Sequence, residues 1–163
     1  MNKVNVVVTG MAWMGSGIGS IESAIERLFR QAKQEILLTV FAIGTSPDSF
    51  LEWLEEALSR GVKVNMIINQ TDKQPHAPMQ RLIAMTKAYP HFHLFNFIGK
   101  GADDLHAKAI VVDRTLALVG SSNLSWHGMT LNHELAILIE GKPATEVAGA
   151  LDQLIISPYV EKQ

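Results

Sequence analysis

Two side chains suited to phosphate chemistry stand two residues apart in an apolar stretch of the chain, His106 and Lys108. If this stretch is a strand, both side chains lie on one face, about 7 Å apart along it. An imidazole can attack phosphorus or move a proton, and an ammonium group stabilises negative charge. The pair could therefore act on one phosphate group. Asp113 has the opposite parity and follows the strand, so we expect it in a turn or a structural ion pair.

Neutral hydrogen-bond donors follow the next apolar stretch, in the run Gly120-Ser121-Ser122-Asn123. Glycine allows backbone N–H groups to come close to a ligand, and hydroxyl and amide groups can donate to phosphate oxygens. We therefore expect Gly120 and Ser122 to bind phosphate, together with Ser121 and Asn123.

A carboxylate that accepts a hydrogen bond from one ring nitrogen of a histidine makes the other nitrogen a better nucleophile. Glu134 stands at the start of a later apolar stretch, next to His133. Either residue could orient His106, and the sequence alone does not choose between them.

Composition places the chain among folded, single-domain proteins. It has 163 residues, of which 47% are hydrophobic and 18% are charged, so we expect one domain over residues 1–163. The absence of cysteine excludes thiol nucleophiles, disulfides and thiolate zinc sites. The formal net charge of −2 is unlike that of a strong nucleic-acid binder, so any phosphate site should be local.

The amino-terminal stretch 1–14 contains one lysine followed by apolar residues, as a signal peptide would. Asn5, Thr9 and Gly10 interrupt it and no cleavage-like site follows, so a strand containing Val4, Val6 and Val8 is favoured. No apolar run approaches the length of about 20 residues that a spanning helix needs. We expect a cytoplasmic protein.

Strands and helices alternate along the chain, in the order β-α-β-α-β-α-β followed by a β-rich end. This order predicts an α/β fold with a mixed, mostly parallel β-sheet and helices on both faces. Ser46 and Pro47 are expected to open the second helix as N-cap and first-turn residues. The helices are expected at 21–34, 47–61, 77–89 and about 143–158, and the strands at 4–8, 35–43, 62–69, 92–97, 105–112, 116–119 and 134–139.

The spacing of these candidate residues resembles the signature of the phospholipase D superfamily, H-x-K-x4-D-x6-G-S-x-N. His106, Lys108, Asp113, Gly120-Ser121 and Asn123 fill every defined position and every gap. Looser likeness extends back through 28–43 and 54–69 and forward to Asn132 and Glu134, where the family often has N-x-E.

The resemblance implies a phosphodiesterase or phosphatidyl transferase that needs no metal or other cofactor. It implies that His106 forms a phosphohistidine while Lys108, Ser121 and Asn123 hold the phosphoryl oxygens. It also implies that Glu134 orients His106 and that Asp113 supports the structure.

Larger members of this family carry two copies of the motif, whereas this chain has one. The chemistry needs two imidazoles, because the nucleophile must be neutral while the acid on the leaving group must be protonated. The simplest solution is a homodimer in which each subunit contributes His106 and Lys108 to one site. Short single-motif relatives, the bacterial nuclease branch and the mitochondrial cardiolipin hydrolase/endonuclease branch, are built in this way.

Three functions stay open. A nuclease that cuts DNA or RNA is favoured by the single motif and by the lack of a membrane-binding segment, although the net charge and the few aromatic residues speak against it. A phospholipid hydrolase of the cardiolipin type would need a hydrophobic face rimmed by lysines, and none is evident. The third function is that of a non-catalytic module that binds nucleic acid or assembles a larger complex.

Other polar groups have simpler interpretations. His91 and His93 share a strand face but have no third metal ligand near them in the sequence, so no metal site is expected. Gly15, Gly17 and Gly19 lack the spacing of a phosphate-binding loop, which favours a flexible turn. Trp126 and His127 could line the substrate cleft or cap the core.

Overall fold

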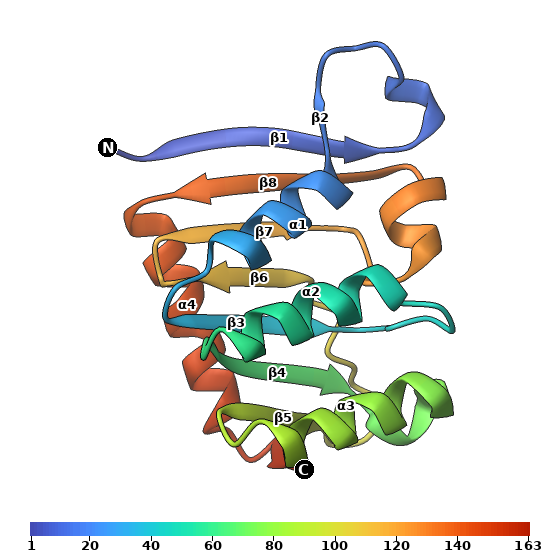
Figure 1. Cartoon of the computed structure of the whole chain (residues 1–163), viewed down its shortest axis with the longest axis vertical. Coiled ribbons are helices and arrows are strands. Elements are labelled where there is room, and N and C mark those ends of the chain that lie inside the picture. The colour runs from blue at the N-terminus through green and yellow to red at the C-terminus, as the bar shows by residue number, and fades with distance from the viewer.

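The computed structural model describes all 163 residues and arranges nine strands in one sheet, shown in Figure 1. From one edge to the other, the strand order is β2-β1-β8-β7-β6-β3-β4-β5-β9. The strands are β1 (Lys3–Thr9), β2 (Gly19–Ser20), β3 (Glu35–Val40), β4 (Lys63–Asn69), β5 (Phe92–Phe97), β6 (Ala109–Val112), β7 (Leu116–Gly120), β8 (Glu134–Glu140) and β9 (Val160–Lys162).

The sheet is mixed, as predicted, but the expectation that most of it would be parallel is wrong. Three pairs are parallel, β1–β2, β3–β4 and β4–β5. The other five pairs are antiparallel. After β5 the chain returns to the middle of the sheet, where β6 runs antiparallel to β3 and two hairpin connections then add β7 and β8. The parallel order expected from alternating elements therefore holds only from β3 to β5.

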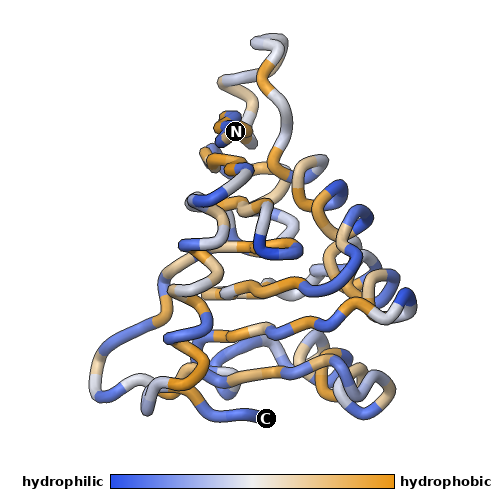
Figure 2. Tube along the Cα trace, turned by 90° about the vertical axis from the view of Figure 1, so that its left-hand side faces the viewer, coloured by the Kyte–Doolittle hydropathy of each residue, from blue (hydrophilic) through white to orange (hydrophobic).

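Helices cover both faces of the sheet, which confirms that prediction. The helices α1 (Ile21–Gln31), α2 (Asp48–Ser59) and α3 (His76–Ala88) lie on one face, and α4 (Lys142–Ile155) lies on the other (Figure 1). Figure 2 shows apolar segments of the first three helices turned toward the sheet. In α1 these are the residues at helical spacing, Ile21, Ala24, Ile25, Leu28 and Phe29.

The core is thick on the side of the three helices and thin on the side of α4. The first side buries a cluster of 33 residues, and the second buries a cluster of seven. Strand β3 contributes to both, with Ile36 and Leu38 on one side and Leu37 on the other. A strand covered on both faces has no solvent-facing positions, which explains its nearly continuous apolar sequence.

Several predicted boundaries are corrected. Strand β3 ends at Val40 rather than at residue 43, and β6 starts at Ala109 rather than at residue 105. Ser46 is not the N-cap of α2, because Pro47 occupies that position without a side-chain cap. Strands β2 and β9 were not expected. Both are short edge strands without the alternation that identifies a strand in sequence.

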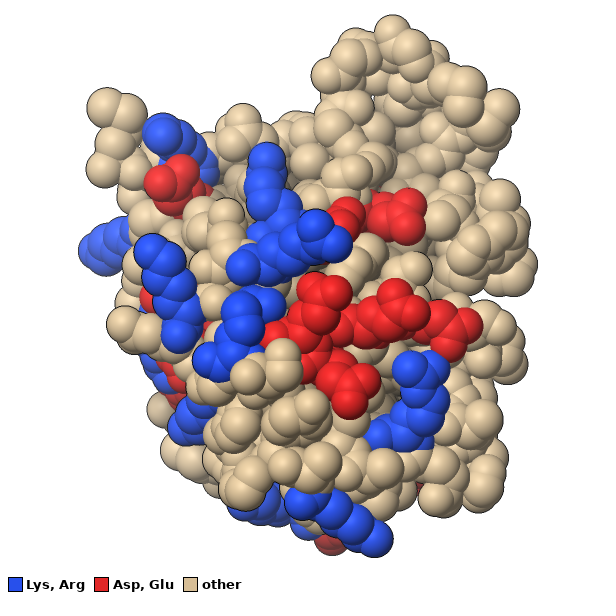
Figure 3. Space-filling view, viewed as in Figure 1, with Lys and Arg blue, Asp and Glu red and all other residues tan.

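The face that carries the three helices is not a basic surface. Figure 3 shows acidic side chains gathered over α2, with basic side chains beside them, over α1 and near α3. The segment 4–21, at the upper edge of the same view, contains no charged residue. A polyanionic backbone would find no continuous cationic track across this face. No helix has the length and apolar character needed to cross a bilayer.

Candidate active site

His106 and Lys108 lie next to each other where the chain enters β6. The Lys108 Nζ atom is 3.1 Å from His106 Nδ1 and 2.8 Å from the backbone carbonyl oxygen of His106. The same ammonium nitrogen is 3.4 Å from His106 Nε2, so it lies beside both ring nitrogens. The contact places a positive charge next to an imidazole, and the two groups could act on one phosphate.

The ring of Phe41 packs against both groups. Its centroid is 4.5 Å from that of the His106 ring and 4.9 Å from Lys108 Nζ. Phe41 directly follows β3, the neighbour of β6. An aromatic face beside an ammonium group gives cation–π stabilisation without neutralising its charge. Phe41 thus restricts the imidazole while leaving the positive charge of Lys108 available to a ligand.

Two buried polar side chains hold the segment before β6 in place. Thr39 donates from Oγ1 to the carbonyl oxygen of Ala107 at 2.9 Å and accepts from the Ala109 N–H at 3.0 Å. Asn69 accepts from the Leu105 N–H at 2.8 Å and donates to Asp104 at 3.0 Å. These bonds replace regular strand pairing, which explains why residues 105–108 stand outside the ladder although they were expected within it.

Burial lowers the pKa of Lys108 below its usual 10.5, and the negative charge of Glu134 acts in the opposite direction. Lys108 forms no ion pair, and its side chain also lines a small internal cavity with Gly120 and Ser122. An ammonium group that is partly desolvated and unpaired gains more from an incoming anion than one already neutralised. The positive charge of Lys108 is thus available to a phosphate group.

Glu134 is bound by two neighbouring side chains. Ser121 donates from Oγ to one carboxylate oxygen, and Asn132 donates from Nδ2 to the other at 3.3 Å. The Leu135 N–H in turn donates to Ser121 Oγ at 3.2 Å. Within one chain no hydrogen bond joins Glu134 to His106. Ser121 and Glu134 are brought together, but the orienting contact expected for Glu134 is not formed inside a single subunit.

His133, the other candidate for that contact, is engaged elsewhere. Its Nε2 accepts from the Ala12 N–H at 3.1 Å, and its ring lies 5.7 Å from that of Trp13. A Cβ atom on Gly10 would come within 2.7 Å of the same imidazole. His133 therefore fastens the segment after β1 to the start of β8 and does not reach His106.

The run from Gly120 to Asn123 lies beside Lys108 but differs from the expectation. The Gly120 N–H donates to the Lys108 carbonyl oxygen at 3.1 Å and the Ser121 N–H to that of Leu135 at 3.2 Å, so neither is free for phosphate. Gly120 is needed for close packing, because a Cβ atom there would lie 2.4 Å from that of Ala136. Ser122 donates inward to the Gly128 carbonyl oxygen. Asn123 Oδ1 is buried without a hydrogen-bond partner.

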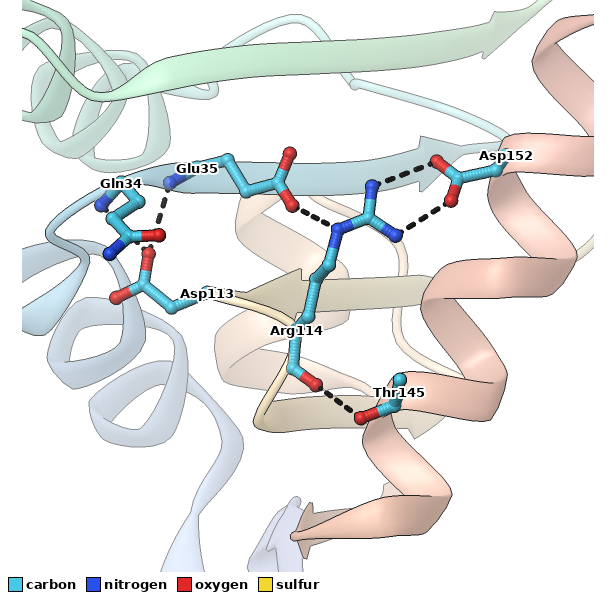
Figure 4. Close-up of polar contacts among 6 residues, drawn as sticks. All are labelled: Gln34, Glu35, Asp113, Arg114, Thr145 and Asp152. Atoms are coloured by element: carbon cyan, nitrogen blue, oxygen red, sulfur yellow. Dashed lines mark hydrogen bonds and ion pairs between the residues drawn. The ribbon is translucent and has the colours of Figure 1, made fainter.

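Asp113 lies in the turn after β6, where its place after the predicted strand had put it. Its carboxylate accepts from the backbone N–H groups of Lys33, Gln34 and Glu35 at 2.8 to 3.0 Å. Figure 4 shows it beside Gln34 and Glu35. These bonds tie the turn between β6 and β7 to the start of β3. The contacts of Asp113 thus join two parts of the sheet, at the end of β6 away from His106.

Trp126 and His127 line a cavity of about 310 Å³ with Gly44, Thr45, Ser46 and Ser125. The side chain of Trp126 is half exposed, so it does not simply cap the core. His91 and His93 bind the Leu58 carbonyl oxygen and the Asn65 side chain. Gly15 and Gly17 adopt positive φ values, as a turn requires.

Sequence reasoning missed Phe41, Thr39 and Asn69. Thr39 interrupts an apolar strand and Asn69 ends one, which is the local signal that these two offered. Phe41 stands in an apolar run and offered none. Their role depends on β3, β4 and the segment before β6 being adjacent. That adjacency is set by strand order, which a local pattern does not reveal.

Comparisons with known proteins bear on the family and the fold of the chain. A family model described as "Cardiolipin synthase, PLD-like domain" matches residues 25–155. DISARM protein DrmC of Bacillus paralicheniformis is 29% identical over 144 residues, which is 86% of this chain and 58% of that relative. The chain thus spans less than two thirds of that relative's length.

Two solved structures share the fold. The phospholipase D family member Nuc from Salmonella typhimurium superposes with a TM-score of 0.77 at 19% identity, covering 100% of this chain and 99% of that one. Phosphatidylserine synthase from Haemophilus influenzae gives the same TM-score at 16% identity, covering 100% of this chain and 40% of that one. At these identities the likeness concerns the fold alone.

Proposed function

Because this chain belongs to the phospholipase D superfamily, we propose that it is a metal-independent phosphodiesterase that cleaves DNA or RNA through a phosphohistidine on His106. The observation that carries the proposal is the contact between the His106 ring and the Lys108 ammonium, 3.1 Å apart. It places an imidazole that can act as nucleophile beside a positive charge that forms no ion pair.

The reaction proceeds in two displacements. A ring nitrogen of His106 attacks phosphorus, so that a P–N bond forms and the P–O bond to the leaving group breaks. The leaving oxygen takes a proton from a second, protonated imidazole. Water then attacks the phosphohistidine and gives its proton to that second imidazole, and the P–N bond breaks. Lys108 stabilises the charge on the phosphoryl oxygens together with Asn123 and with Ser121, whose hydroxyl would first have to turn away from Glu134.

The second imidazole is proposed to be His106 of another copy of the chain. The remaining histidines lack an adjacent lysine at the same spacing, and His133 is bound to the segment after β1. Glu134 has no partner histidine within its own subunit. In a two-fold dimer the carboxylate of one subunit could meet the imidazole of the other, which would give Glu134 the orienting role.

A nucleic-acid substrate is supported by the single motif and by a fold likeness that extends over 99% of Nuc. Phospholipid is the second candidate. It is favoured by the description of the matching family model and by the exposed, uncharged side chains of Met11, Met14 and Ile18, which a lipid surface could receive. A non-catalytic module within a larger assembly is the third.

The deciding experiment offers the purified protein plasmid, single-stranded DNA, RNA and cardiolipin vesicles in excess chelator. We expect cleavage of nucleic acid that persists in the chelator and is lost in His106→Ala. Complete loss in chelator, restored by a divalent ion, would exclude the proposed chemistry. Hydrolysis of cardiolipin to phosphatidic acid and phosphatidylglycerol, with nucleic acid left intact, would establish the phospholipid candidate. Binding without turnover would establish the third candidate.

The shared site is tested by a mixed dimer, purified through two different tags, in which one subunit carries His106→Ala. It lacks either the nucleophile or the acid, so it should be nearly inactive on ordinary phosphodiesters. Activity should return in part on a p-nitrophenyl ester, whose leaving group needs no proton. Half of the wild-type rate on ordinary substrate would show that each subunit works alone. Sedimentation equilibrium of the wild-type protein should give twice the chain mass.

A further inference from the structure

The cavity beside Trp126 adjoins the candidate active site. One wall comes from the loop after β3, with Gly44, Thr45 and Ser46, and the other from the segment after β7, with Ser125, Trp126 and His127. The first loop begins with Phe41, which packs on His106, and the second segment begins with Asn123. Figure 1 shows both at the same end of the sheet.

The two walls are held together by close packing. A Cβ atom on Gly44 would lie 2.7 Å from that of Ser125, and Gly44 has a φ of 75°, which favours glycine. The Gly128 N–H donates to Ser125 Oγ at 3.1 Å. The space between the walls is therefore a built feature and does not depend on a loop movement to form.

Trp126 offers a fixed aromatic face to this space. Its side chain is 51% exposed, and the His127 ring stands against it edge-on, with centroids 5.3 Å apart and an interplanar angle of 86°. The Trp126 carbonyl oxygen accepts from Thr130 Oγ1. His127 opens a single π-helical turn, His127–Leu131, a rare element that is frequent at functional sites.

The chemistry of the lining selects among ligands. Three hydroxyl groups and two aromatic rings face the cavity, with no aliphatic side chain and no lysine, arginine or carboxylate. The lining therefore offers no aliphatic side chain to a fatty acyl chain and no fixed counter-ion to a charged headgroup. A flat heterocycle with hydrogen-bonding edges fits both kinds of lining group.

We propose that this cavity binds a nucleobase next to the scissile phosphate, stacked on Trp126 and bonded at its edge by the hydroxyls of Thr45 and Ser46. The proposal rests on the nuclease function above and narrows its substrate to strands with unpaired bases. Bases in a duplex are stacked on their neighbours, so the enzyme should prefer single strands, where a base can enter the cavity without unstacking.

The test combines two deletions: the indole ring is removed from the protein, and one base is removed from the substrate. Trp126→Ala is compared with wild type on a single-stranded oligonucleotide and on versions with one abasic nucleotide, moved along the strand. Each deletion alone should lower kcat/KM on the order of 5- to 150-fold, the range that alanine substitution gives for base–aromatic stacking. The abasic effect should occur at one position relative to the cleaved bond and should vanish in Trp126→Ala.

Two control variants accompany these measurements. Trp126→Phe keeps a ring and should retain most of the activity. Ile156→Ala removes another exposed apolar side chain, 76% exposed at the end of α4, and should behave as wild type. If Trp126→Ala does not fold, the abasic series on the wild-type protein still decides the question, because it needs no variant.

The possible failures are distinguishable. If the wild-type protein cleaves no oligonucleotide, the nuclease function is wrong and the base site falls with it. If it cleaves oligonucleotides, but an abasic nucleotide has no effect on kcat/KM at any position, only the base site is wrong. The same holds if the two deletions lower kcat/KM independently, so that their effects simply multiply. Vesicle hydrolysis that depends on Trp126 would assign the cavity to a lipid and overturn the proposal.

Discussion

The charged side chains at one end of β6 are paired, and the one at the other end is not. At the end toward β7, Asp113 accepts three backbone N–H groups, and Arg114 forms ion pairs with Glu35 and Asp152 (Figure 4). At the other end, Lys108 makes no ion pair, and burial lowers its pKa. One end has its charges fully partnered, and the other holds a charge that a ligand can still neutralise.

This difference shows how one short motif combines two physical tasks. The partnered end stabilises the hairpin in which Asp113 and Arg114 both adopt positive φ values, 49° and 58°, which side chains rarely tolerate. The hydrogen bond of Arg114 with Asp152 and then that with Glu35 raise the pKa of Arg114 above its usual value. The end that carries Lys108 lacks such stabilisation, as reactive sites commonly do. Substitutions at the two ends should therefore affect different measurements.

The largest effect is expected for His106→Ala. Loss of the nucleophile should lower kcat by about three orders of magnitude or more. Substrate affinity should change little, since Lys108, Ser121 and Asn123 remain. Single-turnover rates and equilibrium binding measure the two quantities separately. A variant that still turns over at a tenth of the wild-type rate would remove His106 from the chemistry.

Lys108→Met should lower kcat/KM by about 10²- to 10³-fold, the usual loss when one charge-stabilising group is removed from an active site. Its stability should be unchanged or higher, because the folded protein no longer holds a partly buried, unpaired ammonium group. Urea unfolding of the two proteins at neutral pH provides the comparison. A clear loss of stability in Lys108→Met would contradict the contrast between the two ends.

Asp113→Ala should act on stability. Three N–H groups before β3 lose their acceptor, and partial access to water limits the loss to about 1–3 kcal/mol in the free energy of unfolding. Asp113→Asn keeps one carbonyl oxygen and should lose less. Activity per folded molecule should stay near the wild-type level. A large fall in kcat without a fall in stability would place Asp113 in the reaction.

Arg114→Lys should have a smaller effect on stability. Lysine cannot reproduce the paired hydrogen bonds to Asp152 at 2.7 and 3.1 Å, yet it keeps the charge. Because the guanidinium group is partly exposed, the loss should be about 0.5–1 kcal/mol. Raising the salt concentration should reduce the difference between variant and wild type. A difference that is independent of salt would indicate that packing, not charge, stabilises this end.

The smallest effect is a change in the pH profile of Glu134→Gln. The charge of Glu134 raises the pKa of Lys108 against the effect of burial, so its removal should lower that pKa further. Lys108 must be protonated to stabilise phosphate, so the alkaline limb of log kcat/KM should move to lower pH. Lys108→Arg is the control, because it should remove this limb in both backgrounds. An alkaline shift would contradict the assignment.

Local patterns predicted much of the fold. Strand β5 was predicted at its observed bounds, Phe92–Phe97, and the apolar face of α1 was identified from helical spacing. The start of β6 was predicted four residues too early, because Thr39 replaces strand pairing with side-chain hydrogen bonds at that point. Such a replacement has no signature in the alternation of apolar and polar residues.

The sequence predicted which residues form the candidate site, but only some of the contacts between them. His106 and Lys108 lie beside each other and Asp113 lies at the other end of β6, although residues 105–108 are not part of that strand. The proposed backbone donors of Gly120 and Ser121 are used within the sheet instead. Whether a backbone N–H is free depends on the neighbouring strand, so the residue type could not answer it.

The sequence by itself determined which residues can do chemistry, their spacing along the chain and the family to which they belong. Only the tertiary structure decided that β6 lies against β3, that Phe41 packs on His106 and that Trp126 and His127 line one cavity with Thr45 and Ser46. Side-chain type and strand parity are local and follow from covalent geometry. The partners of each side chain depend on which distant strands pair, and that is set by the packing of the whole core.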